Sequence, residues 1–232
     1  MIDVRKAAER FHTQIGWLDS WHSFSFGEHY DPKEQGHGLL LVSNDDRVAG
    51  NAGFGTHAHR DMEIVTWVLS GQLAHKDSTG AEGILYPGLA QRMSAGSGVR
   101  HSELNPIGEE SHFVQMWVPP DRNGIEPSYE QRDINEELAG GGLVPVASGQ
   151  GHEGALRIQQ KGAALWAGRI PAGESVAVPE APHAHVFVAT GAIELDGAGA
   201  LAAGDAARLT AAGTPRLTAT GPGTEVLIWA TS

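Results

Sequence analysis

The sequence predicts an all-β fold made of two similar antiparallel barrels. Glycine accounts for 31 of the 232 residues and proline for 12, and the glycine share is about twice the average. Short apolar or β-branched runs stand between these turn residues, for example residues 62–69 and 113–118. This spacing is typical of all-β domains. Helical periodicity is weak, and the helix candidates are residues 127–137 and residues 4–9.

The individual strands follow from the turn residues that bound them. Residues 38–43 form a short apolar run that we expect to end at a turn over Asn44, Asp45 and Asp46. Residues 62–69 stop at Ser70 and Gly71, and residues 72–76 then provide the return strand.

The two halves of the chain resemble one another. WVLSGQL at residues 67–73 matches FVATGAI at residues 187–193 about the turn glycines Gly71 and Gly191. Such a repeat favours two related barrels packed together. We therefore expect an N-terminal barrel over residues 1–135 and a C-terminal one over residues 136–232, with a loose loop rich in Gly, Ala and Ser over residues 139–154.

Composition excludes several functions. There are 16 basic and 28 acidic residues, a net charge of −12, which argues against contact with nucleic acid or an anionic membrane surface. No apolar run approaches the ~20 residues of a spanning helix, and residues 1–14 lack the apolar core of a secretory signal. A cytoplasmic protein is the expectation. With no cysteine, any metal must be held by histidine and carboxylate.

Two same-face pairs of metal-ligating residues stand out. His57 and His59 are two residues apart, as are His101 and Glu103, and side chains at i and i+2 of a strand point to one face. If both strands face the interior of one barrel, the four side chains converge. Three imidazoles and a carboxylate suit one divalent metal ion, Fe(II) first, with Mn(II), Ni(II), Cu(II) and Zn(II) as alternatives.

Longer motifs around these residues carry a family resemblance. GFGTHAHRDMEIVTWVLSG followed by MSAGSGVRHSELNP is similar to the two motifs of the cupin superfamily, and GWLDSWHSFSFGEHYDP resembles a signature of the pirin family. The resemblance implies a bicupin, two jelly-roll barrels of the double-stranded β-helix type, with one metal in the N-terminal barrel. It also implies His57, His59, His101 and Glu103 as ligands. In many cupins the position of Glu63 supplies a ligand instead, and here we expect a supporting role for it.

The C-terminal half repeats the string HAH at His183 and His185. Aligned on the turn glycines, however, these residues fall opposite Glu63 and Val65, outside the ligand positions. No histidine follows them, so we expect no metal in the second barrel. His22, His75 and His112 are expected to be structural.

The function implied by this resemblance is that of a quercetin 2,3-dioxygenase-like oxidoreductase. Its substrates would be O₂ and a small aromatic, flavonol-like molecule, with Glu103 as the general base. One alternative is a pirin-type, redox-sensing regulatory protein that acts through a protein partner. Another is a cupin enzyme with a different substrate. The same four ligands serve all three hypotheses.

Overall fold

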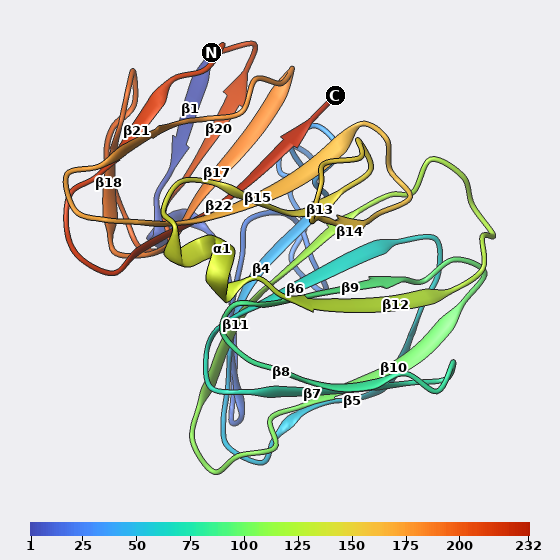
Figure 1. Cartoon of the computed structure of the whole chain (residues 1–232). Coiled ribbons are helices and arrows are strands. Elements are labelled where there is room, and N and C mark those ends of the chain that lie inside the picture. The colour runs from blue at the N-terminus through green and yellow to red at the C-terminus, as the bar shows by residue number, and fades with distance from the viewer.

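The computed structural model describes all 232 residues and contains two domains, each built from a seven-stranded and a four-stranded sheet (Figure 1). In the N-terminal domain the strands of the larger sheet are, in spatial order, β12 (Ser128–Asp133), β9 (Leu89–Ser94), β6 (Glu63–Ser70), β11 (Ser111–Val118), β4 (Val42–Val48), β3 (Leu18–His22) and β2 (Phe11–Ile15). Those of its smaller sheet are β5 (Gly53–His59), β10 (Val99–Leu104), β7 (Leu73–Asp77) and β8 (Glu82–Leu85).

The C-terminal domain repeats this arrangement. The strands of its larger sheet are β1 (Ile2–Arg5), β20 (Ala206–Thr210), β17 (His183–Thr190), β22 (Thr224–Thr231), β15 (Ala163–Ile170), β13 (Val144–Ser148) and β14 (Leu156–Arg157). Those of its smaller sheet are β16 (Ser175–Ala177), β21 (Arg216–Ala219), β18 (Ala192–Leu195) and β19 (Gly199–Ala202). The only helices are a short 3₁₀ turn, η1 (Ala7–Glu9), and α1 (Asn135–Ala139). Neither is long or apolar enough to cross a membrane.

The turn glycines of the predicted repeat lie at equivalent corners of the two domains. Gly71 joins β6 to β7 and Gly191 joins β17 to β18, with φ of 77° and 72°. A Cβ on Gly71 would lie 2.7 Å from the carbonyl oxygen of Glu110, and one on Gly191 would lie 2.6 Å from the Thr224 hydroxyl. Both corners therefore require glycine. The bicupin fold class is confirmed, although the two sheets of each domain are not hydrogen-bonded into a closed barrel.

The two domains share one hydrophobic core. A cluster of 22 buried residues joins the larger sheets, with Val65 and Trp67 from one domain and Leu165 and Trp229 from the other. The Trp67 indole also donates a hydrogen bond of 2.5 Å to Glu225 across the interface. Truncating either fully buried tryptophan to alanine would cost about 3–5 kcal/mol. The domains therefore pack as one unit.

The N-terminal strand belongs to the sheet of the other domain. β1 pairs with β20, with Ile2 opposite Leu209 and Arg5 opposite Ala206, and Figure 1 shows the blue strand within the C-terminal domain. A division of the chain at residue 135 stays a prediction. The crossing of β1 adds a link between the domains that the sequence does not reveal.

Three local predictions were wrong. Residues 127–137 are mostly strand β12, because pairing with β9 outweighs their helical propensity, and only α1 is helical. Within the expected loop over residues 139–154 lies β13. The strand expected at residues 38–43 instead begins at Val42 and runs through the expected turn to Val48.

Candidate metal centre

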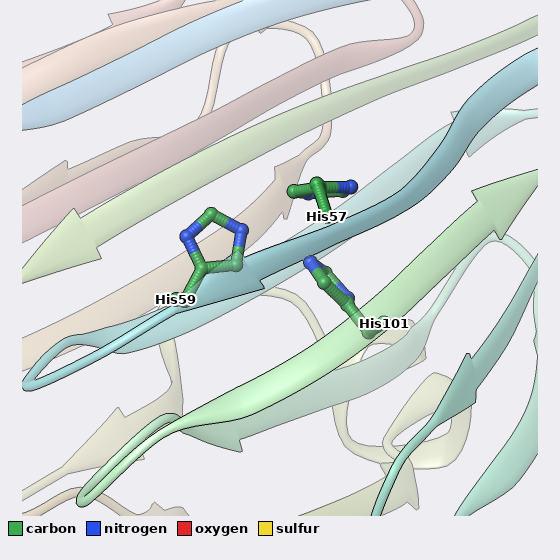
Figure 2. Close-up of side chains that lie close together, drawn as sticks. All are labelled: His57, His59 and His101. Carbon is green, nitrogen blue, oxygen red and sulfur yellow. The ribbon is translucent and has the colours of Figure 1, made fainter.

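Three imidazoles converge from two neighbouring strands of the smaller N-terminal sheet. β5 carries His57 and His59, and β10 carries His101 directly opposite His57 in the antiparallel pairing. One nitrogen of each ring lies within 4.8 Å of a nitrogen of the other two, and the rings face a common space (Figure 2). The i, i+2 spacing on β5 and the pairing with β10 together bring about this cluster, as the sequence predicts.

Two of the three imidazoles have a buried ring nitrogen that no other group of the protein bonds. The Nε2 atoms of His59 and His101 are buried without a hydrogen-bond partner, which is costly for a polar atom. His57 Nδ1 donates to the Gly55 carbonyl at 2.8 Å, which leaves the lone pair on its Nε2. Burial, together with the neighbouring imidazoles, lowers the pKa of His59 to about 4 and of His101 to about 3. Because metals bind neutral imidazole, these three side chains fit a divalent metal ion.

Glu103 lies beside this cluster. Both of its carboxylate oxygens accept from Nε2 of Gln115 at 2.9 Å, and burial raises its pKa. One oxygen lies within 4.8 Å of ring nitrogens of His75 and His101, but Glu103 does not belong to the three-histidine group. The pairing of β10 with β5 shifts register between His101 and Glu103, and the extra residue lies on β5. The role of Glu103 as a fourth ligand stays a prediction.

A supporting pair behind His101 was missed at the level of sequence. His75 and Asp77 lie on β7, opposite Glu103 and His101 respectively. His75 Nε2 donates to Asp77 Oδ2 at 3.0 Å, so its Nδ1 is an acceptor and faces His101 Nδ1 at 3.4 Å. His101 therefore carries its hydrogen on Nδ1 and its lone pair on Nε2, toward the cluster. The sequence predicts only a structural role for His75. The spacing of His75 and Asp77, again i and i+2 on one strand, could have indicated a histidine–carboxylate pair that supports the cluster.

The Asp77 carboxylate is itself held firmly. Burial alone would raise its pKa, but hydrogen bonds from Thr79 and His75 lower it. The backbone N–H groups of Thr79 and Ala81 also donate to it, at 2.8 and 3.1 Å. The ring of Tyr129 stacks on His75 with centroids 4.5 Å apart. The Asp77 carboxylate, with its lowered pKa, is thus a firmly held partner of His75.

Glu63, the alternative carboxylate, faces away from the imidazoles. It is fully buried, and its Oε2 accepts from the Ser94 hydroxyl at 2.7 Å and from the backbone N–H of Gln159 at 3.0 Å. Because Gln159 lies in the C-terminal half, Glu63 links the two domains. Neither group of potential metal ligands includes it.

A cavity of about 610 Å³ opens onto the cluster. His57, His59 and Glu103 lie in its wall, together with the rings of Phe54 and Trp117. This volume suits a small organic ligand. The mix of imidazole, carboxylate and aromatic side chains suits a flat, oxygen-bearing molecule.

The fold and this site define the class of protein: a bicupin with a candidate divalent-metal centre in its N-terminal domain. Comparison with known proteins agrees. The family profile for pirins matches residues 3–118, and the profile for the quercetinase C-terminal cupin domain matches residues 145–229. The chain belongs to the pirin family.

The relatives are bacterial proteins of similar length. A Mycobacterium tuberculosis protein, named provisionally as a quercetin 2,3-dioxygenase, is 54% identical over 98% of this chain and 94% of its own length. The quercetin 2,3-dioxygenase of Escherichia coli is 48% identical over 69% of this chain and 68% of its own length. The bacterial pirin YhhW from Escherichia coli, solved in complex with nickel(II), has a TM-score of 0.90 at 37% identity and covers 99% of this chain and 98% of its own. These names agree with the enzyme class that the sequence predicts.

Proposed function

We propose that this protein is a metal-dependent dioxygenase that cleaves flavonol-like substrates, with His57, His59, His101 and Glu103 as metal ligands. The observation that carries the proposal is the cluster of imidazole nitrogens without partners at the wall of an aromatic-lined cavity. The names of the relatives and the nickel(II) bound by the Escherichia coli pirin support it. Fe(II) is the metal we propose, because an open site of imidazole and carboxylate is typical of non-haem iron oxygenases.

When bound, the metal would hold the oxygen atoms of the substrate and lower the pKa of its hydroxyl. Glu103 then acts as the general base that takes the hydroxyl proton. Burial raises its pKa, so its carboxylate accepts a proton more readily than an exposed glutamate does. Gln115 orients Glu103, and Gln115 is itself held by a 3.0 Å hydrogen bond from the indole of Trp117.

Oxygen uptake tests this proposal. Protein loaded anaerobically with Fe(II) should consume O₂ when quercetin is added, and parallel samples with Mn(II), Ni(II), Cu(II) and Zn(II) rank the metals. Glu103→Gln keeps the shape of the side chain but not its basicity, so kcat should fall by about 100-fold or more.

Metal content is measured in the same variant, because Glu103 is also proposed as a ligand. Full turnover by Glu103→Gln would rule out its role as base. No uptake with quercetin or other flavonols, in protein shown to contain metal, would rule out the proposed substrate class.

A further inference from the structure

Five buried polar side chains form a floor to the cavity beyond the imidazole cluster. This set, which we call the polar strip, lies on three neighbouring strands of the larger sheet and comprises Gln115 on β11, Asn44 and Asp46 on β4, and Ser20 and His22 on β3. Each is at most 8% exposed. Burying so many polar groups is unfavourable unless they have partners, so the strip calls for an explanation beyond folding.

The strip leads away from the candidate metal centre. Gln115, which contacts Glu103, is paired with Asn44, and Asn44 is paired with His22. Neighbouring strands are about 4.8 Å apart, so His22 lies about 10 Å from Gln115. In the adjoining row, Asp46 is paired with Ser20.

Hydrogen bonds within the protein leave two polar atoms of the strip without partners. His22 Nδ1 donates to Asn44 Oδ1 at 2.9 Å, its Nε2 accepts from the Thr13 hydroxyl at 3.0 Å, and the Ser20 hydroxyl donates to Asp46 Oδ1. No group of the protein bonds Asn44 Nδ2 or Asp46 Oδ2, and neither atom is sealed from the cavity. One fixed donor and one carboxyl oxygen therefore remain for a ligand.

The rest of the wall is aromatic. Phe26 stacks on His22 with centroids 5.2 Å apart and meets Trp117 edge-on at 5.5 Å, and all three line the cavity. Burial raises the pKa of Asp46 to about 7, despite the Ser20 hydrogen bond. At neutral pH its carboxyl can therefore donate or accept. Flat walls and paired polar atoms suit an aromatic ring with neighbouring hydroxyl groups.

We propose that the polar strip binds the hydroxyl groups on the far ring of a flat, polyhydroxylated aromatic substrate, with Asn44 Nδ2 donating to one hydroxyl and Asp46 Oδ2 bonding its neighbour. The near ring of the same molecule lies at the imidazole cluster. The inference rests on the proposed function for that near end. It adds that this enzyme selects for hydroxyl groups that reach β4, one strand away from Gln115.

Binding of two flavonols tests the strip directly. Quercetin carries two neighbouring hydroxyls on its far ring, and galangin carries none there. Dissociation constants are measured anaerobically on the Fe(II)-loaded protein by quenching of tryptophan fluorescence. The wild type should bind quercetin about tenfold more tightly than galangin. Asn44→Leu should remove most of this preference and leave the galangin constant within about twofold.

The controls separate a lost contact from a lost fold. Arg47→Gln alters an exposed residue on the opposite face of the same strand and should keep the preference. Asp46→Asn keeps the shape of the side chain and should also reduce the preference for quercetin. This variant replaces Asn44→Leu if the latter does not fold. Equal affinity of the wild type for both flavonols, or equal weakening of both by Asn44→Leu, would overturn the strip and leave the proposed function standing. Binding of neither flavonol to the wild type would overturn both.

Discussion

The two domains share one topology, but the interior of the N-terminal domain is polar and contains a cavity, whereas that of the C-terminal domain is apolar and packed. β16 and β21 of the C-terminal domain occupy the places of β5 and β10. Aligned on Gly71 and Gly191, Leu217 on β21 is paired with Leu195 where Glu103 on β10 is paired with His75. These positions of the second domain are therefore apolar.

The rest of the C-terminal interior is apolar as well. A cluster of 14 buried hydrophobic residues packs it, including Val188 and Val226 on its central strands. At the matching central strands, the N-terminal domain has Thr66 and Gln115 and a cavity. The same pair of sheets therefore encloses a packed apolar core in the C-terminal domain and a cavity in the N-terminal domain, because different side chains point inward.

The string HAH occurs in both domains, but only the copy in the N-terminal domain lies on a strand next to a third histidine. His57 and His59 lie on β5, beside β10, whereas His183 and His185 lie on β17 of the larger sheet. His185 is 2% exposed and contacts Phe24 of the N-terminal domain, with centroids 5.7 Å apart. Neither candidate group of metal ligands includes it.

The largest expected effect separates the two HAH strings. His101→Ala removes one of three converging donors, so the purified protein should lose its metal and all oxygenase activity. His183→Ala is the matched control from the other domain and should keep full metal content. Metal content is measured by elemental analysis after anaerobic loading. Metal retained at wild-type affinity in His101→Ala would contradict the proposed centre.

A second variant tests the support behind the cluster. Asp77→Asn removes the charge that orients His75, and through it the Nδ1 hydrogen of His101. Metal affinity, measured by competition with a chromophoric chelator, should fall about 10- to 100-fold. In the metal-free protein, ¹⁵N NMR should show a His101 tautomer different from that of the wild type. An unchanged His101 tautomer would contradict the role of Asp77 in orienting His101 and leave it only a structural one.

The smallest effect concerns the buried histidine of the packed domain. Burial lowers the pKa of His185 from 6.5 to about 3, so below about pH 6.5 the unfolded chain binds a proton that the folded chain does not. The stability of the neutral form is fully present above that pH and is lost as pH falls, by about 1.4 kcal/mol per unit between about pH 6 and 4. His185→Leu should remove this part of the slope in denaturant unfolding measured across that range. An equal slope in the variant would show that other groups cause it.

Much of the fold could be predicted because turns and strand patterns are local. Gly71 and Gly191 mark equivalent corners, and the apolar runs between turn residues are strands. The failures occurred where a polar strand looks like a turn. Asn44 and Asp46 have the composition of a turn, but they lie in β4, whose backbone is paired with β3 on one side and β11 on the other, and their side chains line the cavity.

Which side chains can share a face of a strand is evident from residue spacing alone. The spacing of His57 and His59, and of His101 and Glu103, follows from the two-residue period of a strand and needs no knowledge of neighbours. Which strands lie side by side, and hence the support of His101 by His75 and Asp77, is evident only in the folded protein. The same holds for Asn44 and Asp46, which line the cavity on the strand next to that of Gln115. Pairing between strands distant in the chain depends on the packing of the whole sheet, which no local pattern encodes.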